Sequence, residues 1–254
     1  PAYLETGLSG TSRSALPLNA DSLVGRTNFT LQGLYRFADG SVGMLGLVRG
    51  AWPFPDSLSN VLAPLYQQET RHLAYLFMDP QGRLQRATAF PYTLAADIHD
   101  FEFSDQGVVF CGFLNGTLFT DQGALTSGTT ATGLGEWFFA SNGLVVALNR
   151  EGPIRWMINM EGSASSYARA LVVRGDEVWV SGYRLDNIIL HPDTSSVLTG
   201  EGGFLARYHR LSGRYLGGQS GPKHMLINNF HQTPYDSGRL LMSGKFIDVL
   251  SWQE

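Results

Sequence analysis

The feature that most constrains this fold is a glycine-centred β-type pattern that occurs four times along the chain. Short apolar runs stop at Gly46, Gly112, Gly182 and Gly244, and a further apolar or aromatic run follows each of them. The separations are 66, 70 and 62 residues, which is too regular for chance and too irregular for a fibrous repeat. The pattern predicts an array of similar supersecondary units.

Each unit is expected to begin with a hairpin. A β-type run and a turn signal precede each glycine, and the turn signals lie at 39–40, 105–107, 175–176 and 236–238. Asp caps its own backbone and Gly tolerates positive φ, so both residues suit tight turns. A second hairpin follows in the first three units, with its turn at Gly82, Gly152 or Gly213. Two hairpins make a four-stranded antiparallel meander.

Repeated four-stranded meanders are most simply closed as blades around an axis, because radial packing buries both faces of each small sheet. The sequence therefore predicts an all-β fold, a β-propeller of four-stranded antiparallel blades with three full repeats and one half repeat. The repeats are expected at about 27–95, 96–162, 163–222 and 223–254, the last of them incomplete. A β-sandwich is the alternative, although it does not require a period of this length.

Residues 1–26 precede the first clear repeat. They form a lead-in that could supply a ring-closing strand to the fourth repeat, although no hairpin turn is evident within them. The chain begins with Pro1 and continues for ten residues after Gly244. We therefore expect it to be part of a longer polypeptide or assembly.

The charge pattern argues against two classes of partner. The formal net charge is −4, and the 18 Lys and Arg residues are scattered without a run. Nucleic-acid binding needs a positive stripe that displaces counterions, so no nucleic-acid partner is expected. The apolar runs are far shorter than the roughly 20 residues of a membrane-spanning helix, so no transmembrane segment is expected. Charged residues make up only 16% of the chain, as in a secreted or surface-exposed β protein.

Residues 136–218 contain, in order, an apolar strand at 145–149, a turn at 150–152, a strand with Trp156, a segment at 167–173 and a strand at 178–182. This succession resembles the SBBP-type β-propeller repeats of secreted bacterial proteins. The likeness is weaker over 28–135. Such repeats are common in surface proteins of Bacteroidota, often ahead of a type IX secretion sorting domain. The resemblance implies a propeller in an extracellular or cell-surface bacterial protein, and it implies no catalytic residues.

Carboxylates are the candidates for catalysis. They form two groups in the sequence, Asp97, Asp100, Glu102 and Asp105, and then Asp176 with Glu177. Residues i and i+2 of a strand share a face, so Asp100 and Glu102 are expected to point together. Paired carboxylates can carry out glycoside hydrolysis. Solvated edge or turn carboxylates are the favoured interpretation, and the chain is not expected to be an enzyme.

Other chemically distinctive residues are interpreted as structural. The single cysteine, Cys111, lies in a predicted strand and is expected to fill apolar space rather than act as a nucleophile. The Arg-Gly-Asp tripeptide at 174–176 coincides with a hairpin turn, which explains it without integrin binding. The sequons at Asn28 and Asn115 would accept glycans in a eukaryotic secretory pathway.

No metal or cofactor site is predicted. The sequence has six histidines, His72, His99, His191, His209, His224 and His231. No two of them are spaced at i, i+2 or i, i+4, so their spacing gives no support to metal ligation. Calcium loops, serine elbows and phosphate-binding glycine loops are also missing from the sequence.

Aromatic groups and long connections are the candidates for binding. The aromatic groups are Trp52 with Phe54, and Trp137 with Phe138 and Phe139. They could stack on sugars, although packing between blades is the favoured interpretation. Long connections carry function on rigid scaffolds. The binding surface is therefore expected on a face formed by residues 47–70, 117–135 and 184–201.

The sequence thus predicts a non-enzymatic extracellular scaffold for interaction or adhesion on a bacterial surface. Its expected partner is a protein or a surface glycan. One alternative is a carbohydrate-active hydrolase with Asp100 or Glu102 in its channel. The other alternative is a structural spacer within a large secreted or secretion-associated assembly.

Overall fold

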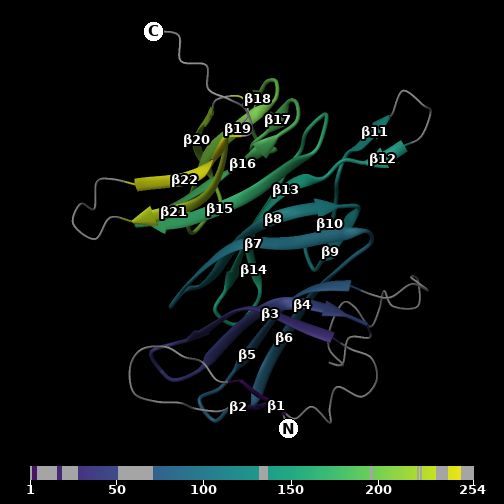
Figure 1. Cartoon of the computed structure of the whole chain (residues 1–254). Helices are drawn as coiled ribbons and strands as arrows, with labels where there is room; N and C mark the ends of the chain where they lie inside the picture. Colours follow the sequence, from purple (N-terminus) through teal and green to yellow (C-terminus); the bar gives the residue numbers. More distant parts are fainter. Residues whose placement is uncertain are drawn as a thin grey trace. The chain divides into compact units, whose positions relative to one another are not determined.

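In a computed structural model of the protein, every regular element of the described residues is a β-strand (Figure 1). The structure describes residues 2–4, 16–18, 28–50, 71–131, 137–194, 197–221, 223, 225–232 and 240–246. Over these ranges, no helix is long and apolar enough to cross a membrane. The predicted all-β class is confirmed. The chain divides into two compact units, residues 1–91 and 92–254.

The first unit contains the first predicted repeat. Its strands are β3 (Asn28–Arg36), β4 (Val42–Arg49), β5 (Arg71–Met78) and β6 (Leu84–Tyr92). Neighbouring strands pair in that order, and the β3–β4 and β4–β5 pairs are antiparallel. Gly40 and Gly82 make the turns with φ values of +86° and +77°, which other residues rarely adopt. Met44, Ala74 and Leu76 belong to the buried core of this sheet.

A short hairpin precedes this meander. β1 (Ala2–Leu4) pairs with β2 (Leu16–Leu18) in antiparallel register. The lead-in therefore contains a pair of strands that its sequence does not predict, because the connection between them carries no recognisable tight-turn signal.

The second unit contains two further four-stranded meanders. The second repeat consists of β7 (Ala95–Ser104), β8 (Gly107–Asn115), β13 (Asn142–Asn149) and β14 (Ile154–Met160). The third repeat consists of β15 (Ser166–Arg174), β16 (Glu177–Arg184), β19 (Gly202–His209) and β20 (Tyr215–Ser220). Antiparallel β21 (Met225–Gln232) and β22 (Leu240–Phe246) follow as a half repeat. The predicted four-stranded antiparallel sheet is confirmed for the second and third repeats, whereas the sheet of the first repeat contains two further strands.

Additional hairpins lie between the second and third strands of these repeats. They pair β9 (Thr117–Thr120) with β10 (Gly123–Thr126), β11 (Thr129–Ala131) with β12 (Trp137–Phe139), and β17 (Ile188–Ile189) with β18 (Val197–Leu198). They occupy connections that the sequence marks as long and polar. Each leaves its sheet at the end where β8 or β16 finishes, and we call this the inserted-hairpin end.

The cores of the second and third repeats form one hydrophobic cluster. Val109, Val145 and Ile158 of the second repeat meet Val180 and Phe204 of the third repeat within it, and none of the five is more than 5% exposed. β13 is buried over all but its last residue, because both faces of this central strand are covered. The two sheets therefore pack against each other, and each buries an apolar face of the other, as small sheets need for stability.

Each repeated glycine lies opposite a β-bulge in the first strand of its repeat. The glycine pairs with the residue before the bulge, Gly46 with Leu31, Gly112 with Ile98, Gly182 with Ala168 and Gly244 with Ile227. A Cβ at Gly46 would lie 2.5 Å from a carbonyl oxygen of β3, and one at Gly112 or Gly182 would lie closer still to a carbonyl of β7 or β15. The strands run through these glycines and do not stop there. The repeated glycine therefore marks close approach of the bulged backbone.

Candidate functional site

The bulges place a polar residue at the same position in all four repeats. The extra residues of the bulged strands are Gln32, His99, Arg169 and Asn228. A bulge re-aims a side chain, and bulges are common next to functional sites. In the second unit, β15 lies beside both β7 and β21. Their bulges therefore lie in one region, in the half of each strand nearer the inserted-hairpin end.

Two carboxylates of β7 cap the free edge of β15. The Leu171 N–H donates to Asp100 Oδ2 at 2.9 Å, and the Val173 N–H donates to Glu102 Oε2 at 2.6 Å. β15 is the edge strand of its sheet, so these amides need partners from outside the sheet. Asp100 and Glu102 thus point together, as their spacing suggests, and they link two consecutive repeats.

These bonds leave the two carboxylates poorly placed for catalysis. Burial raises the pKa of both groups, and the main-chain N–H donors oppose the shift. Asp100 also accepts the Phe101 N–H through Oδ1 at 2.9 Å, so both of its oxygens already have main-chain donors. A general acid or base must instead reach the proton of a substrate. The geometry therefore supports a structural role for the pair.

His99 contacts the bulge of the adjacent strand. Its Nδ1 lies 2.7 Å from the Ala168 carbonyl oxygen. Because a carbonyl only accepts hydrogen bonds, Nδ1 carries the hydrogen and Nε2 keeps its lone pair. Burial is the main cause that lowers the pKa of His99, and the positive charge of Arg169 lowers it further. The hydrogen bond to the Ala168 carbonyl and the negative charge of Asp97 raise it, and the net shift is downward. His99 is therefore a neutral imidazole at neutral pH, with Nε2 able to accept a hydrogen bond.

Aromatic rings flank this histidine. The ring centroid of Phe113 lies 5.5 Å from that of His99 and 5.5 Å from that of Tyr167, the latter in an edge-to-face contact. The guanidinium carbon of Arg169 lies 5.9 Å from the Tyr167 ring centroid, within cation–π range. The three rings are half-buried and Arg169 is exposed. We call His99, Phe113, Tyr167 and Arg169 the bulge patch.

Cys111 lies in the core behind this region. It pairs with Asp100 between β8 and β7 and is fully buried in the cluster shared by the second and third repeats. Burial, followed by the charge of Asp100, raises the pKa of its thiol well above the usual range. Because the thiolate is the nucleophilic form, this environment disfavours thiol chemistry. The cysteine occupies apolar space.

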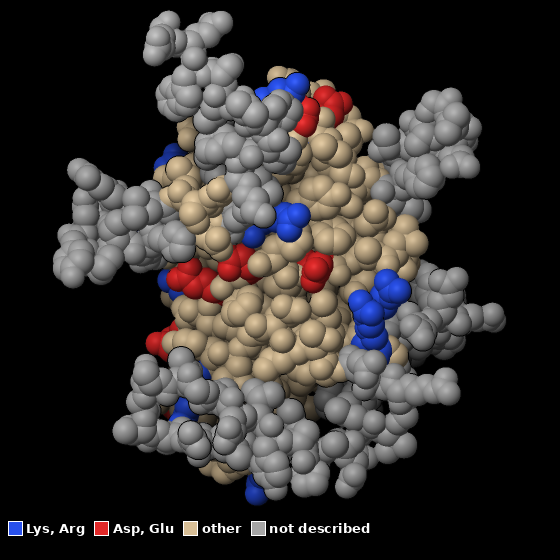
Figure 2. Space-filling view, viewed as in Figure 1, with Lys and Arg blue, Asp and Glu red and all other residues tan. Residues whose placement is uncertain are grey.

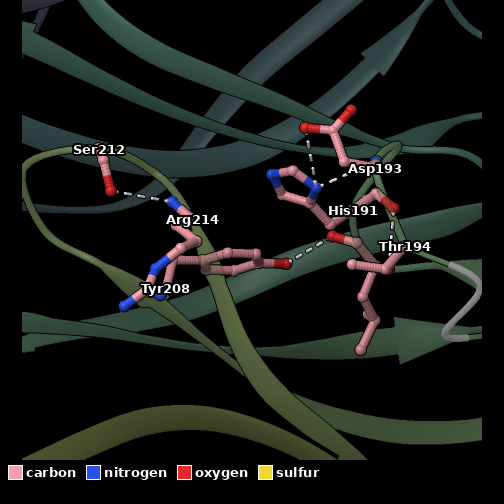
Figure 3. Close-up of polar contacts among 7 residues, drawn as sticks. His191, Asp193, Thr194, Tyr208, Ser212 and Arg214 are labelled. Carbon is pink, nitrogen blue, oxygen red and sulfur yellow. Dashed lines mark hydrogen bonds and ion pairs between the residues drawn. The ribbon is translucent and has the colours of Figure 1, made fainter.

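The segment around β17 and β18 is fastened to the sheet of the third repeat (Figure 3). Tyr208 of β19 is fully buried, and its hydroxyl donates to the Leu190 carbonyl at 2.7 Å. The His191 ring packs against Tyr208 with centroids 6.4 Å apart. Its Nδ1 accepts the Asp193 N–H at 3.1 Å. This part of the predicted binding face is therefore held by a defined set of contacts.

Arg184 holds the base of the same segment. Only 2% of Arg184 is exposed. Its guanidinium donates to the Thr199 carbonyl at 3.1 Å, the Gly203 carbonyl at 2.6 Å and the Ser220 hydroxyl at 2.9 Å. These acceptors replace part of the hydration that a buried guanidinium loses, so Arg184 orders both ends of the inserted segment.

The connection that carries β9 and β10 is fastened in a similar way. The Gly116 N–H donates to Ser127 Oγ at 2.8 Å, which closes the base of the hairpin. Asn159 Nδ2 of β14 donates to the Thr126 carbonyl at 3.2 Å. Two of the three predicted binding connections are thus anchored to their sheets, while most of the third, residues 51–70, lies outside the described residues.

Apolar side chains are exposed at the inserted-hairpin end. Leu94, Leu185 and Val197 are 46%, 50% and 47% exposed. Leu94 lies just before β7, and Leu185 and Val197 lie in the connection between β16 and β19. On the face drawn in Figure 2, acidic and basic side chains are interspersed over a largely uncharged surface. Exposed apolar side chains that occur together at one end of a sheet are candidates for an interaction site.

The other predicted candidates do not join this region. Asp105, Asp176 and Glu177 lie in or next to hairpin turns at the opposite end of the sheets, and the 174–176 tripeptide spans the β15–β16 turn. Among the residues that the structure describes, no group of three or more His, Cys, Asp or Glu is arranged to hold a metal ion. Asn115 ends β8 and donates to Ser141 Oγ at 3.4 Å.

The predicted aromatic and glycan candidates are only partly covered by the structure. Trp52 and Phe54 lie outside the described residues, and so do the side chains of Asn28 and of β12. The bulge patch itself was not predicted. A polar residue that precedes each repeated glycine by 14, 13, 13 or 16 residues is the signal that could have located it.

Comparison with known proteins gives no assignment. No protein family matches the chain, and no curated protein is similar to it. A cobalt-substituted apocarotenoid oxygenase of Synechocystis has a TM-score of 0.38 and 13% identity over 85% of this chain and 43% of its own. A point mutant of that oxygenase has a TM-score of 0.36 and 11% identity over 78% of this chain and 41% of its own. BamB from Moraxella catarrhalis has a TM-score of 0.21 and 12% identity over 78% of this chain and 81% of its own.

The chain spans less than half the length of these oxygenases. Likeness at these scores carries no information about function. The chemistry of this protein therefore has to be inferred from its own residues.

Proposed function

We propose that the repeats are blades of a β-propeller and that the protein is a non-enzymatic extracellular scaffold that binds a protein or surface glycan on a bacterial surface. The observation that carries this proposal is that the first strand of the third repeat lies beside the first strands of the second and fourth. First strands meet in this way when small sheets are arranged radially. The resemblance of residues 136–218 to SBBP-type repeats supports the same arrangement and location.

Links between consecutive repeats support blade packing. Asp100 and Glu102 join the first strands of the second and third repeats, β7 and β15. At the other side of the second sheet, Trp156 of β14 donates its indole N–H to the Arg210 carbonyl at 2.8 Å. A Cβ at Gly213 would lie 2.8 Å from that indole, so the glycine leaves room for it. Both edges of the second sheet thus contact the third repeat.

The inserted-hairpin end is the proposed binding face. It combines exposed Leu94, Leu185 and Val197 with connections anchored by Arg184 and Tyr208. A fixed loop loses less conformational freedom when it binds than a mobile one, which favours affinity. The hydrolase alternative is less favoured, because both of its carboxylates accept main-chain hydrogen bonds.

Binding assays with turnover readout test this function. The purified protein would be presented to bacterial surface glycans and surface proteins, and bound material would be analysed for cleavage. We expect capture without product. A double variant with Leu185→Ser and Val197→Ser should lose capture, whereas Leu211→Ser should keep it, because Leu211 is 48% exposed at the opposite end of the sheets.

The outcomes separate the alternatives. Product release would support the hydrolase. Absence of capture across all glycans and proteins would support the spacer and contradict the scaffold. Equal loss of capture in the Leu211→Ser control and the double variant would contradict the assignment of the binding face.

A further inference from the structure

We infer that the bulge patch binds a carboxylate-bearing sugar, a hexuronic acid residue, as the recognised part of a surface glycan. The inference deepens the proposed scaffold function and rests on it. Its basis is the juxtaposition, by two neighbouring bulges, of an exposed guanidinium, an imidazole acceptor and aromatic rings.

The bulges explain why these groups meet. His99 and Arg169 are the extra residues of β7 and β15. They occupy the same position in consecutive repeats, and the bond from His99 Nδ1 to the Ala168 carbonyl fixes the imidazole one residue from Arg169. Each bulge displaces its extra residue from the strand's regular alternation, and this leaves Arg169 exposed and His99 half-buried.

Arg169 supplies the donor for a carboxylate. Its side chain is exposed, and among the described residues no hydrogen bond or ion pair to its guanidinium is found. The planar guanidinium matches both oxygens of a carboxylate, which lysine cannot do. Its position over the Tyr167 ring restricts the side chain before a ligand arrives, which reduces the entropy that binding costs.

His99 and Asp97 supply acceptors for hydroxyl groups. With Nδ1 committed to the Ala168 carbonyl, Nε2 of His99 is an acceptor. Asp97 Oδ1 accepts the Ile98 N–H at 2.9 Å. Asp97 lies opposite Phe113 of the bulge patch in the β7–β8 pairing, so its Oδ2 is a further acceptor beside the patch. Acceptors for hydroxyl hydrogens beside the guanidinium of Arg169 match a sugar acid better than a fatty-acid anion, which has no hydroxyl groups.

The aromatic rings supply the apolar contact. Phe113 and Tyr167 form a half-buried edge-to-face pair whose remaining surface lies next to His99 and Arg169. Both rings present apolar faces, and Tyr167 adds a polar hydroxyl at its tip. The C–H face of a pyranose is an apolar surface that fits such rings. Together these groups can bind the carboxylate, the hydroxyl groups and the ring face of one sugar residue.

Calorimetric titration with trigalacturonate tests the inference. We expect saturable binding by the wild-type protein, and binding about 10- to 100-fold weaker for Arg169→Gln, because loss of a charge-assisted hydrogen bond has this effect on affinity. The trimethyl ester of the same trisaccharide should bind about as weakly to the wild type. Arg214→Gln is the matched control, because Arg214 is an exposed arginine at the opposite end of the sheets, and it should bind like the wild type.

Three results would overturn the inference. One is an equal affinity for the acid and its ester, which would mean that the carboxylate is not recognised. Another is an equal loss in Arg169→Gln and Arg214→Gln, which would indicate nonspecific charge attraction. The third is the absence of trigalacturonate binding while the capture that depends on Leu185 and Val197 persists, which would reject the sugar-acid site and leave the scaffold function standing.

Discussion

Alanine at Gly112 should destabilise the protein by at least about 3 kcal/mol. The added Cβ would collide with the main-chain carbonyl of Asp97, and a backbone atom cannot swing away as the end of a side chain can. The bulge would have to shift, together with the Asp100 hydrogen bond to the Leu171 N–H that depends on it. Overpacking costs about 1–3 kcal/mol, and a hydrogen bond to a charged group contributes about 1.5–3 kcal/mol.

Urea unfolding followed by tryptophan fluorescence measures this effect. Gly128→Ala is the matched control, because the nearest atom to its Cβ would be the Gly162 carbonyl oxygen at an ordinary 3.4 Å, and its stability should change by less than about 0.5 kcal/mol. In a thermal scan, Gly112→Ala should lower Tm by about 6 °C or more, at about 2–4 °C per kcal/mol. Equal stability of the two variants would refute the link between the repeated glycines and the bulges.

Three further predictions concern buried polar groups. Burial lowers the pKa of His72 to about 4, so between pH 6.5 and 4 the unfolded chain takes up a proton that the folded chain does not. The free energy of unfolding should therefore fall by about 1.4 kcal/mol for each pH unit that the pH is lowered over this range. His72→Leu should remove this slope in denaturation measured at several pH values, and an unchanged slope would contradict the role of His72. Burial raises the pKa of Asp100 and Glu102, so their favourable contribution to folding stability is present below the ordinary pKa values of 3.8 and 4.5 and is lost as pH rises through the folded-state pKa values. A double variant with Asp100→Asn and Glu102→Gln should therefore gain stability relative to the wild type as pH rises. Plots of Tm against pH that run parallel for the two proteins would contradict this prediction. Tyr208→Phe should cost about 1–2 kcal/mol, because it leaves the Leu190 carbonyl without its donor, and it should speed proteolysis within 185–201; no change in either measurement would show that the hydroxyl does not hold the segment.

Much of the strand order could be predicted because it depends on local chemistry. Gly82, Gly152 and Gly213 adopt φ values of +77°, +105° and +69°, and few residues other than glycine fit such turns. Two turns per repeat and a regular spacing then define four antiparallel strands. The long polar connections were also recognisable, although the hairpins that they form were not, because strands of two to four residues carry almost no periodic pattern.

The bulges could not be predicted from any single repeat, and the contacts between repeats could not be predicted at all. A bulge depends on how two strands pair, and nothing in the sequence around His99 alone marks it as the extra residue. The sequence therefore predicts strand ends at the repeated glycines, whereas in the structure these glycines accommodate the bulged partner strand. In the same way, the spacing of Asp100 and Glu102 predicts that the two side chains point in the same direction. It does not predict that they accept hydrogen bonds from N–H groups of β15, because that strand lies about 70 residues further along the chain.

Distances between spin labels would test the radial arrangement of the repeats most directly. In a Cys111→Ala background, one pair of labels would be placed on first strands with Gln32→Cys and Arg169→Cys, and a second pair on fourth strands with Arg86→Cys and Gln219→Cys. All four positions are exposed and belong to the first and third repeats. Double electron–electron resonance should give a narrow and clearly shorter distance for the first-strand pair, because first strands of a propeller face the axis. Equal distances, or a shorter distance for the fourth-strand pair, would contradict the propeller.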